Sequence, residues 1–144
     1  MGMDFLTALN VSGSALSAER VRVNLASSNL ANAETTRDAN GNVYKRLDPV
    51  FESLPMGDAQ DIAPEATGPM GVRVSRIVAD GGPGRKVYSP GHPDADPDGF
   101  VTFPDVNPVH EVVNLMSASR AYDANAVAVE TLKQMAARGL EITK

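Results

Sequence analysis

The sequence predicts a mainly α-helical chain in which two terminal helices enclose a small β-rich insert. Of the ten Pro and twelve Gly residues, nearly all lie between Ala33 and Asn107. The two ends are almost free of both residue types, and each carries apolar residues at helical spacing. The ends are also electrically neutral, so the excess of five acidic charges lies in the middle. We therefore divide the chain into an N-terminal helical segment (1–33), an insert (34–106) and a C-terminal helical segment (107–144).

The first helix is expected over about residues 4–32, where Gly13 is the only interruption. One apolar stripe recurs at intervals of seven and consists of Leu9, Leu16, Val23 and Leu30, with Phe5 on the same side. A second stripe lies on roughly the opposite side and consists of Val11, Ala18, Val21 and Leu25. A helix that packs on a single core needs only one apolar face. Two such faces predict a helix that lies between two neighbours.

The second helix is expected to begin at Asn107-Pro108, a capping residue followed by proline at the first helical position. Glu111 suits the first turn, and the helix extends to about residue 142, which is roughly 50 Å. Its apolar rows resemble the a/d seam of a coiled coil, with Asn125 as a polar member that can fix the register. We expect the two helices to pair in a coiled-coil-like manner. The predicted contact residues are Leu9, Leu16, Val23, Leu30, Leu115, Tyr122, Asn125, Val129 and Leu132.

The insert contains short candidate strands. They span residues 43–47, 72–78, 86–88 and 100–103, and in the second of them Val72 and Val74 alternate with polar residues. Residues 54–69 are too rich in Pro, Gly and Asp for regular structure and have no role that the sequence identifies.

Composition excludes several classes of protein. The chain has no Cys, which excludes disulfide frameworks, thiolate metal sites and cysteine nucleophiles, and two His cannot build a His-rich metal site. The net charge of -5 disfavours nucleic-acid binding. No apolar run is long enough for a membrane span, so no membrane insertion is expected. The first residues lack a basic n-region, so no cleaved signal peptide is expected either.

Residues 94–105 match the calcium loop of an EF-hand at several oxygen-ligand positions. Prolines before and inside this loop prevent the helix–loop–helix frame, so a solvated acidic loop is the prediction. His110-Glu111 imitates the start of a zinc-protease motif, but Asn114 occupies the position of the second histidine. No combination of nucleophile, base and orienting acid is recognisable. We therefore expect no enzyme activity, no metal, no cofactor and no small-molecule substrate.

The run SSNLANA at residues 27–33 closely resembles the N-terminal signature of flagellar basal-body rod and hook proteins. Its signature residues are Ser28, Asn29, Leu30, Ala31, Asn32 and Ala33. The resemblance continues in GHPDADPDGFV at residues 91–101, in Asn107-Pro108-Val109 and in MSASRAYDAN at residues 116–125. These later blocks are similar to the proximal rod subunit in particular.

The resemblance implies a fold, a location and a set of partners. In this family the terminal helices pair as an inner domain, and the insert forms a small β-rich outer part. Subunits of such an axial filament stack helically into the rod, the drive shaft of the flagellum, which crosses the periplasm and transmits torque for swimming. The implied partners are further copies of the chain, other rod proteins, the rod–MS-ring junction and the flagellar type III export apparatus.

Two alternatives from other classes stay open at this stage. One is a soluble calcium-binding module that uses Asp94, Asp96, Asp98 and Thr102, for which calcium-dependent ordering is the discriminating observation. The other is a secreted coiled-coil effector or chaperone, which would stay soluble and would not polymerise with rod subunits. An enzyme is a remote third.

Overall fold

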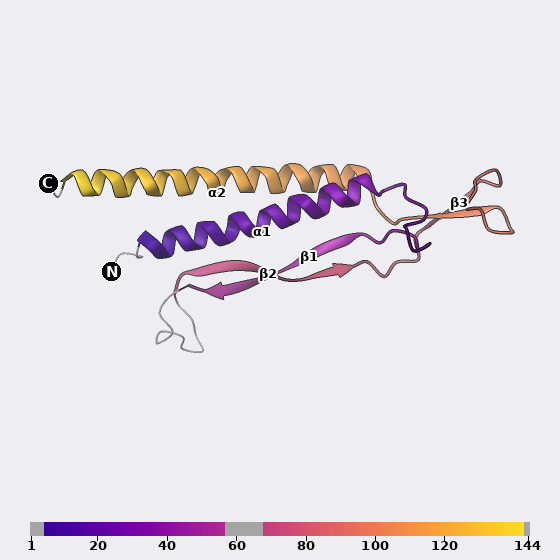
Figure 1. Cartoon of the computed structure of the whole chain (residues 1–144), viewed down its shortest axis with the longest axis horizontal. Coiled ribbons are helices and arrows are strands. Elements are labelled where there is room, and N and C mark those ends of the chain that lie inside the picture. The colour runs from indigo at the N-terminus through magenta and orange to yellow at the C-terminus, as the bar shows by residue number, and fades with distance from the viewer. Residues whose placement is uncertain (1–4, 57–67, 143–144) are drawn as a thin grey trace.

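The computed structural model describes residues 5–56 and 68–142, and it is elongated (Figure 1). The elements in chain order are α1 (Phe5–Ala31), β1 (Leu47–Pro55), β2 (Met70–Ala79), β3 (Arg85–Tyr88), β4 (Phe100–Phe103) and α2 (Pro108–Ile142). The helices α1 and α2 run antiparallel and side by side, the β1–β2 sheet lies along the other side of α1, and the β3–β4 sheet lies at the end where α2 begins (Figure 1). This confirms two terminal helices with a small antiparallel insert.

The start of α2 and the end of α1 lie close to where the sequence predicts them. The side-chain oxygen of Asn107 accepts hydrogen bonds from the backbone N–H groups of Val109 (3.0 Å) and His110 (3.3 Å), so it caps α2. Helix α1 ends at Ala31, one residue before the expected limit. There the backbone N–H and the side-chain amide of Asn32 both donate to the Ser28 carbonyl (3.0 and 2.9 Å), which closes the last turn.

Each sheet has two antiparallel strands. Strands β1 and β2 pair from Leu47↔Ala79 to Pro55↔Met70, with a break in register between Val50 and Phe51. Strands β3 and β4 pair from Arg85↔Phe103 to Tyr88↔Phe100. The strands expected at 72–78, 86–88 and 100–103 are confirmed within β2, β3 and β4.

The strand expected at 43–47 is wrong, because β1 begins only at Leu47. Two prolines, Pro49 and Pro55, obscured β1 in the sequence. In a sheet of two strands both strands are edges, and an edge tolerates a residue without an N–H donor. The segment expected to be irregular, 54–69, begins within β1, and its residues 57–67 lie outside the described part of the chain.

The core is small and lies along α1 and at the start of α2. Its apolar members are Ala18, Leu25, Ala26, Ala33, Val101, Val106 and Ala118. Helix α1 contacts α2 on one side and both β1 and β2 on the other, whereas the described part of α2 packs against no strand. The prediction that α1 lies between two neighbours is therefore confirmed.

The stripe of α1 that includes Ala18 and Leu25 faces the sheet. Ser14, on the same side of the helix, accepts a hydrogen bond from the backbone N–H of Val72 (3.1 Å). Gly71 suits this position, since a Cβ there would lie 2.8 Å from the Ser14 oxygen and would also meet the side chain of Met56, so one or both would have to move. At this point the backbone of β2 therefore lies directly against α1.

Candidate assembly surface and its anchoring junction

Helices α1 and α2 pack along each other, and one side of α2 is covered. The α2 side chains that are buried or half-buried recur every three or four residues and are Glu111, Asn114, Leu115, Ala118, Ala121, Asn125, Ala128, Val129, Leu132 and Ala136. On α1, Leu9, Leu16, Val23 and Leu30 are half-buried. Val129 lines one surface hollow of about 510 Å³ together with Leu9 and Leu16.

Two of the predicted contact residues lie differently from the others. The Tyr122 side chain is 37% exposed, at the margin of the contact. The amide of Asn125 donates to the Ala121 carbonyl of its own helix (2.9 Å). That bond satisfies part of its polar group within α2, so the register-fixing role expected of Asn125 stays a prediction.

The side chain of Asn29 joins α1 to the insert. Asn29 is 1% exposed, and its amide oxygen accepts the backbone N–H of Leu47 (2.9 Å) while its amide nitrogen donates to the Leu47 carbonyl (2.9 Å). Both backbone groups of the first residue of β1 are thus satisfied by one side chain. The hydroxyl of Tyr44 also donates to the Asn29 oxygen (2.9 Å). This pattern holds the start of β1 against the last turns of α1.

The carboxylate of Glu111 connects the same point to α2. It is 1% exposed, accepts from the Asn29 amide (3.2 Å), and pairs with the guanidinium of Arg46 (2.7 Å). Arg46 also contacts the carboxylate of Asp48. We call Asn29, Arg46, Leu47 and Glu111 the junction, because they join both helices to the insert.

The charge of Arg46 is stabilised in this setting. Partial burial opposes the charge, but the hydrogen bond to Glu111 and the negative charges of Asp48 and Glu111 outweigh it, so the pKa of Arg46 is raised. A cation with a raised pKa stabilises the fold at every pH below its unfolded pKa, and that contribution is lost only as the pH rises through the raised value. Arg46 therefore keeps its charge throughout the physiological range.

The family-signature residues occupy the end of α1 and the turn after it. Ser28 lies within hydrogen-bond distance of the Tyr44 hydroxyl (3.3 Å), and Asn32 accepts from the Thr35 hydroxyl (3.2 Å). Ala33 is buried, Leu30 is half-buried and Ala31 is exposed. Asn29 has the most specific role of the set, because it alone bonds the backbone of β1.

The acidic loop before β4 is structured by its own carboxylates. Asp94 accepts from the Thr36 hydroxyl (2.6 Å) and pairs with Arg37 (3.0 Å). Asp96 accepts the backbone N–H groups of Asp98 (3.1 Å) and Phe100 (2.8 Å). Two candidate calcium ligands are therefore engaged within the chain, and residues 5–56 and 68–142 contain no cluster of three His, Cys, Asp or Glu side chains suited to a metal.

A hollow of about 600 Å³ beside the junction is lined by charged and polar groups that include Asp38, Lys45, Arg46, Asp80 and Asp105. It is open to solvent on one side. Neither described helix is long and apolar enough to cross a membrane.

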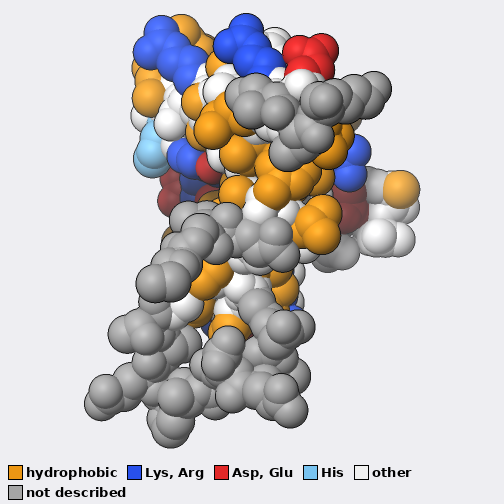
Figure 2. Space-filling model, turned by 90° about the vertical axis from the view of Figure 1, so that its left-hand side faces the viewer, with side chains coloured by type: hydrophobic (Ala, Val, Ile, Leu, Met, Phe, Trp, Pro, Cys, Tyr) orange, Lys and Arg blue, Asp and Glu red, His pale blue; other side chains and the backbone are white. Residues whose placement is uncertain are grey.

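Helix α2 also presents apolar side chains on the side that faces away from α1. Val109, Val113, Met116 and Val127 are between 51% and 74% exposed. Figure 2, which looks along the helices, shows hydrophobic side chains at the surface beside Lys and Arg. We call this row, together with Arg120 and Asp123, the outer stripe of α2. Sequence analysis missed it because the two charged residues interrupt it, although its spacing of four, three, four, three and four residues was a readable signal.

Comparison with known proteins assigns both ends of the chain to one class. The family model described as "Flagella basal body rod protein" matches residues 9–37, which cover most of α1 and the signature turn. The model described as "Flagellar basal body rod FlgEFG protein C-terminal" matches residues 98–142, which cover β4 and α2. The two terminal helices are thus those of a flagellar basal-body rod protein.

Whole-chain relatives narrow this class. The chain is 40% identical over 141 residues to the flagellar basal-body rod protein FlgC of Salmonella typhimurium, covering 97% of this chain and 98% of the relative. It is 41% identical over 144 residues to FlgC of Bacillus subtilis (94% and 96%) and 35% identical over 150 residues to FlgC of Borreliella burgdorferi (97% and 98%). The chain belongs to the FlgC family of flagellar basal-body rod proteins.

Proposed function

We propose that this chain is a structural subunit of the rod of the bacterial flagellar basal body, in its proximal part, and that it polymerises through its terminal helices. The observation that carries the proposal is the similarity to FlgC proteins over nearly the whole chain. It is a structural protein and not an enzyme. The alternatives of a calcium-binding module and a secreted coiled-coil protein have no support in the relatives.

Assembly through the helices is supported by the apolar side chains that the fold leaves exposed on α2. The antiparallel pairing of α1 and α2 covers the side of α2 that faces α1, but the outer stripe of α2 stays exposed. A row of exposed Val and Met side chains favours a protein partner. We therefore place contacts between subunits on the helices, and we propose that segments 1–33 and 107–144 form an inner domain and 34–106 an outer one.

The nine predicted contact residues acquire a more specific role in this proposal. Eight of them are half-buried in the isolated chain, so they stabilise the helix pair that assembly requires. We propose that this pair packs in a coiled-coil-like manner within the rod. The chain meets other rod proteins there, and further partners are the rod–MS-ring junction and the flagellar type III export apparatus.

The experiment is deletion of the gene in a motile host, followed by complementation with the unchanged gene. Loss of swimming, with basal bodies that lack a complete rod, is expected, and complementation should restore both. A deletion strain that swims and builds complete rods would overturn the proposal.

A further inference from the structure

We infer that the outer stripe of α2 packs against the exposed face of α1 in a neighbouring copy of this chain, with Asp123 of one copy opposite Arg20 of the next. The inference rests on the proposed function and names the two surfaces that meet. Its starting point is the outer stripe itself, a row of large apolar side chains that the fold leaves in solvent.

The spacing of the outer stripe predicts a helix as its partner. Its members follow one another at alternating steps of three and four residues, which is the spacing of a coiled-coil seam. The row extends over about 27 Å of α2, since each residue advances about 1.5 Å. A straight row of this kind fits along a second helix and does not fit a small ligand.

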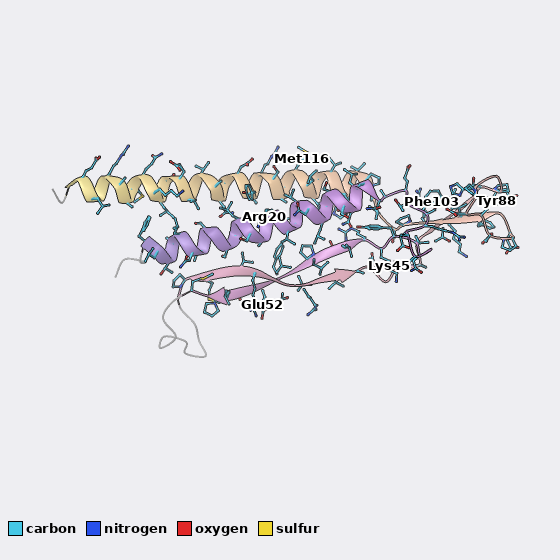
Figure 3. The ribbon with its side chains drawn as sticks, viewed as in Figure 1. Arg20, Lys45, Glu52, Tyr88, Phe103 and Met116 are labelled. Atoms are coloured by element: carbon cyan, nitrogen blue, oxygen red, sulfur yellow. The ribbon has the colours of Figure 1, made fainter. Side chains whose placement is uncertain are left out.

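The exposed face of α1 has the matching spacing and the complementary size. It consists of the exposed residues Asn10, Ser17, Arg20, Asn24 and Ser27 and of the half-buried Gly13, again at alternating steps of three and four. Most of these side chains are small, and Gly13 has open space around its Cα. Met and Val from another helix can therefore approach closely. In Figure 3, Arg20 of α1 and Met116 of α2 mark these two faces.

The charges select one alignment of the two surfaces. Asn29 is bonded to Glu111, and because the helices are antiparallel, Arg20 of α1 lies at the level of Arg120 of α2. A neighbour placed at the same height would oppose two like charges. A shift of three residues, about 4.5 Å, brings Asp123 opposite Arg20 instead. Among the described residues neither Arg20 nor Asp123 forms an ion pair within the chain.

The same shift matches the apolar residues. Met116 then lies opposite Ser27, and Val127 lies within one residue of the level of Ser17. The two surfaces differ, so the contact is heterologous and each copy keeps one of each for the next neighbour. Such a contact propagates with all copies pointing the same way, which suits a polar assembly.

Disulfide crosslinking in assembled basal bodies tests the inference, because the chain has no cysteine of its own. The gene is replaced by a double variant, Ser17→Cys with Val127→Cys, and basal bodies are isolated under oxidising conditions. We expect covalent oligomers of the chain, whereas each single variant should give none. The outer stripe faces away from α1 of its own chain, so a bond within one molecule is not expected.

A second pair of cysteines tests the competing arrangement, in which the outer stripes of two copies pack against each other. Met116→Cys with Val127→Cys crosslinks only if two outer stripes pair with each other in antiparallel orientation, where Arg120 would face Asp123. Crosslinking of this pair, or intact rods in which the first pair gives no crosslink, overturns the inference while leaving the proposed function in place. If the unchanged gene builds no rod, the proposed function itself fails.

A charge exchange provides the second readout. Arg20→Asp and Asp123→Arg should each abolish swimming, and the two together should restore it, because the pair is then re-formed with reversed polarity. If the double variant swims no better than the single variants, the pairing of these two residues is wrong.

Discussion

Asn29 acts as a substitute for a neighbouring strand. Its amide pairs with both backbone groups of Leu47, as a peptide unit in a sheet would, and it does so from within a helix. The sequence identified Asn29 only as part of a family signature. Its partners lie 18 residues away at Leu47 and 82 residues away at Glu111, so no local pattern reveals them.

Replacing Asn29 with Ala should lower the free energy of unfolding by about 2 kcal/mol or more, because two buried backbone groups lose their partner. Urea unfolding of the purified chain, followed by circular dichroism, measures it. The matched control is Asn24→Ala on the exposed face of α1, with an expected change within about 0.5 kcal/mol. Equal effects from the two variants would show that the junction is not specific.

The Glu111→Gln variant should be destabilised, because Arg46 then keeps its charge without its best partner. Arg46 is partly exposed, so the loss should fall below the roughly 3–5 kcal/mol of a fully buried broken pair. Glu52→Gln breaks the exposed pair with Arg73 and should cost less than about 1 kcal/mol. A ranking of the two variants in the opposite order in urea unfolding would contradict the role of Glu111.

At the level of the elements, the helices were predictable and the sheets only partly so. Asn107 and Pro108 mark the start of α2 by local chemistry, and the two stripes of α1 indicated two neighbours. Strand β1 was misplaced because Pro49 is usually a sign against a strand, and only its pairing with β2 makes it one.

An introduced carboxylate should have different effects on the two sides of α2. Leu132→Asp, on the side facing α1, should destabilise the chain and abolish swimming, because it places a carboxylate in the helix contact. Val127→Asp, on the outer stripe, should abolish swimming but leave unfolding within about 0.5 kcal/mol of the unchanged chain. Swimming assays and urea unfolding are measured in parallel. A Val127→Asp strain that swims normally would exclude the outer stripe from assembly.

The acidic loop should not respond to calcium. Asp94 is held by Thr36 and Arg37, and Asp96 by the backbone of β4 and its preceding turn, so binding a cation would require these bonds to break. Titration calorimetry with calcium should therefore detect no binding with a dissociation constant below about 10⁻⁵ M, the range of calcium sensors. A tighter constant would revive the calcium-binding alternative.

For the whole molecule, the shape follows from how little core the chain has. Few large side chains are fully buried, and α2 leaves several large apolar side chains, such as Val109 and Val127, more than half exposed. A chain built this way gains its remaining burial from neighbours. Composition and periodicity predicted the two terminal helices. The outer stripe could not be predicted from them, because it is defined by which side of α2 packs against α1.

The central claim is that this chain is a rod subunit that assembles through its terminal helices. An image reconstruction of the assembled basal body, with side chains resolved, tests it most directly. We predict that α1 and α2 lie antiparallel in the wall of the proximal rod, with Val113, Met116 and Val127 buried against a neighbouring subunit. Density for the chain outside the rod, or a rod in which these side chains face solvent on every copy, would contradict the account.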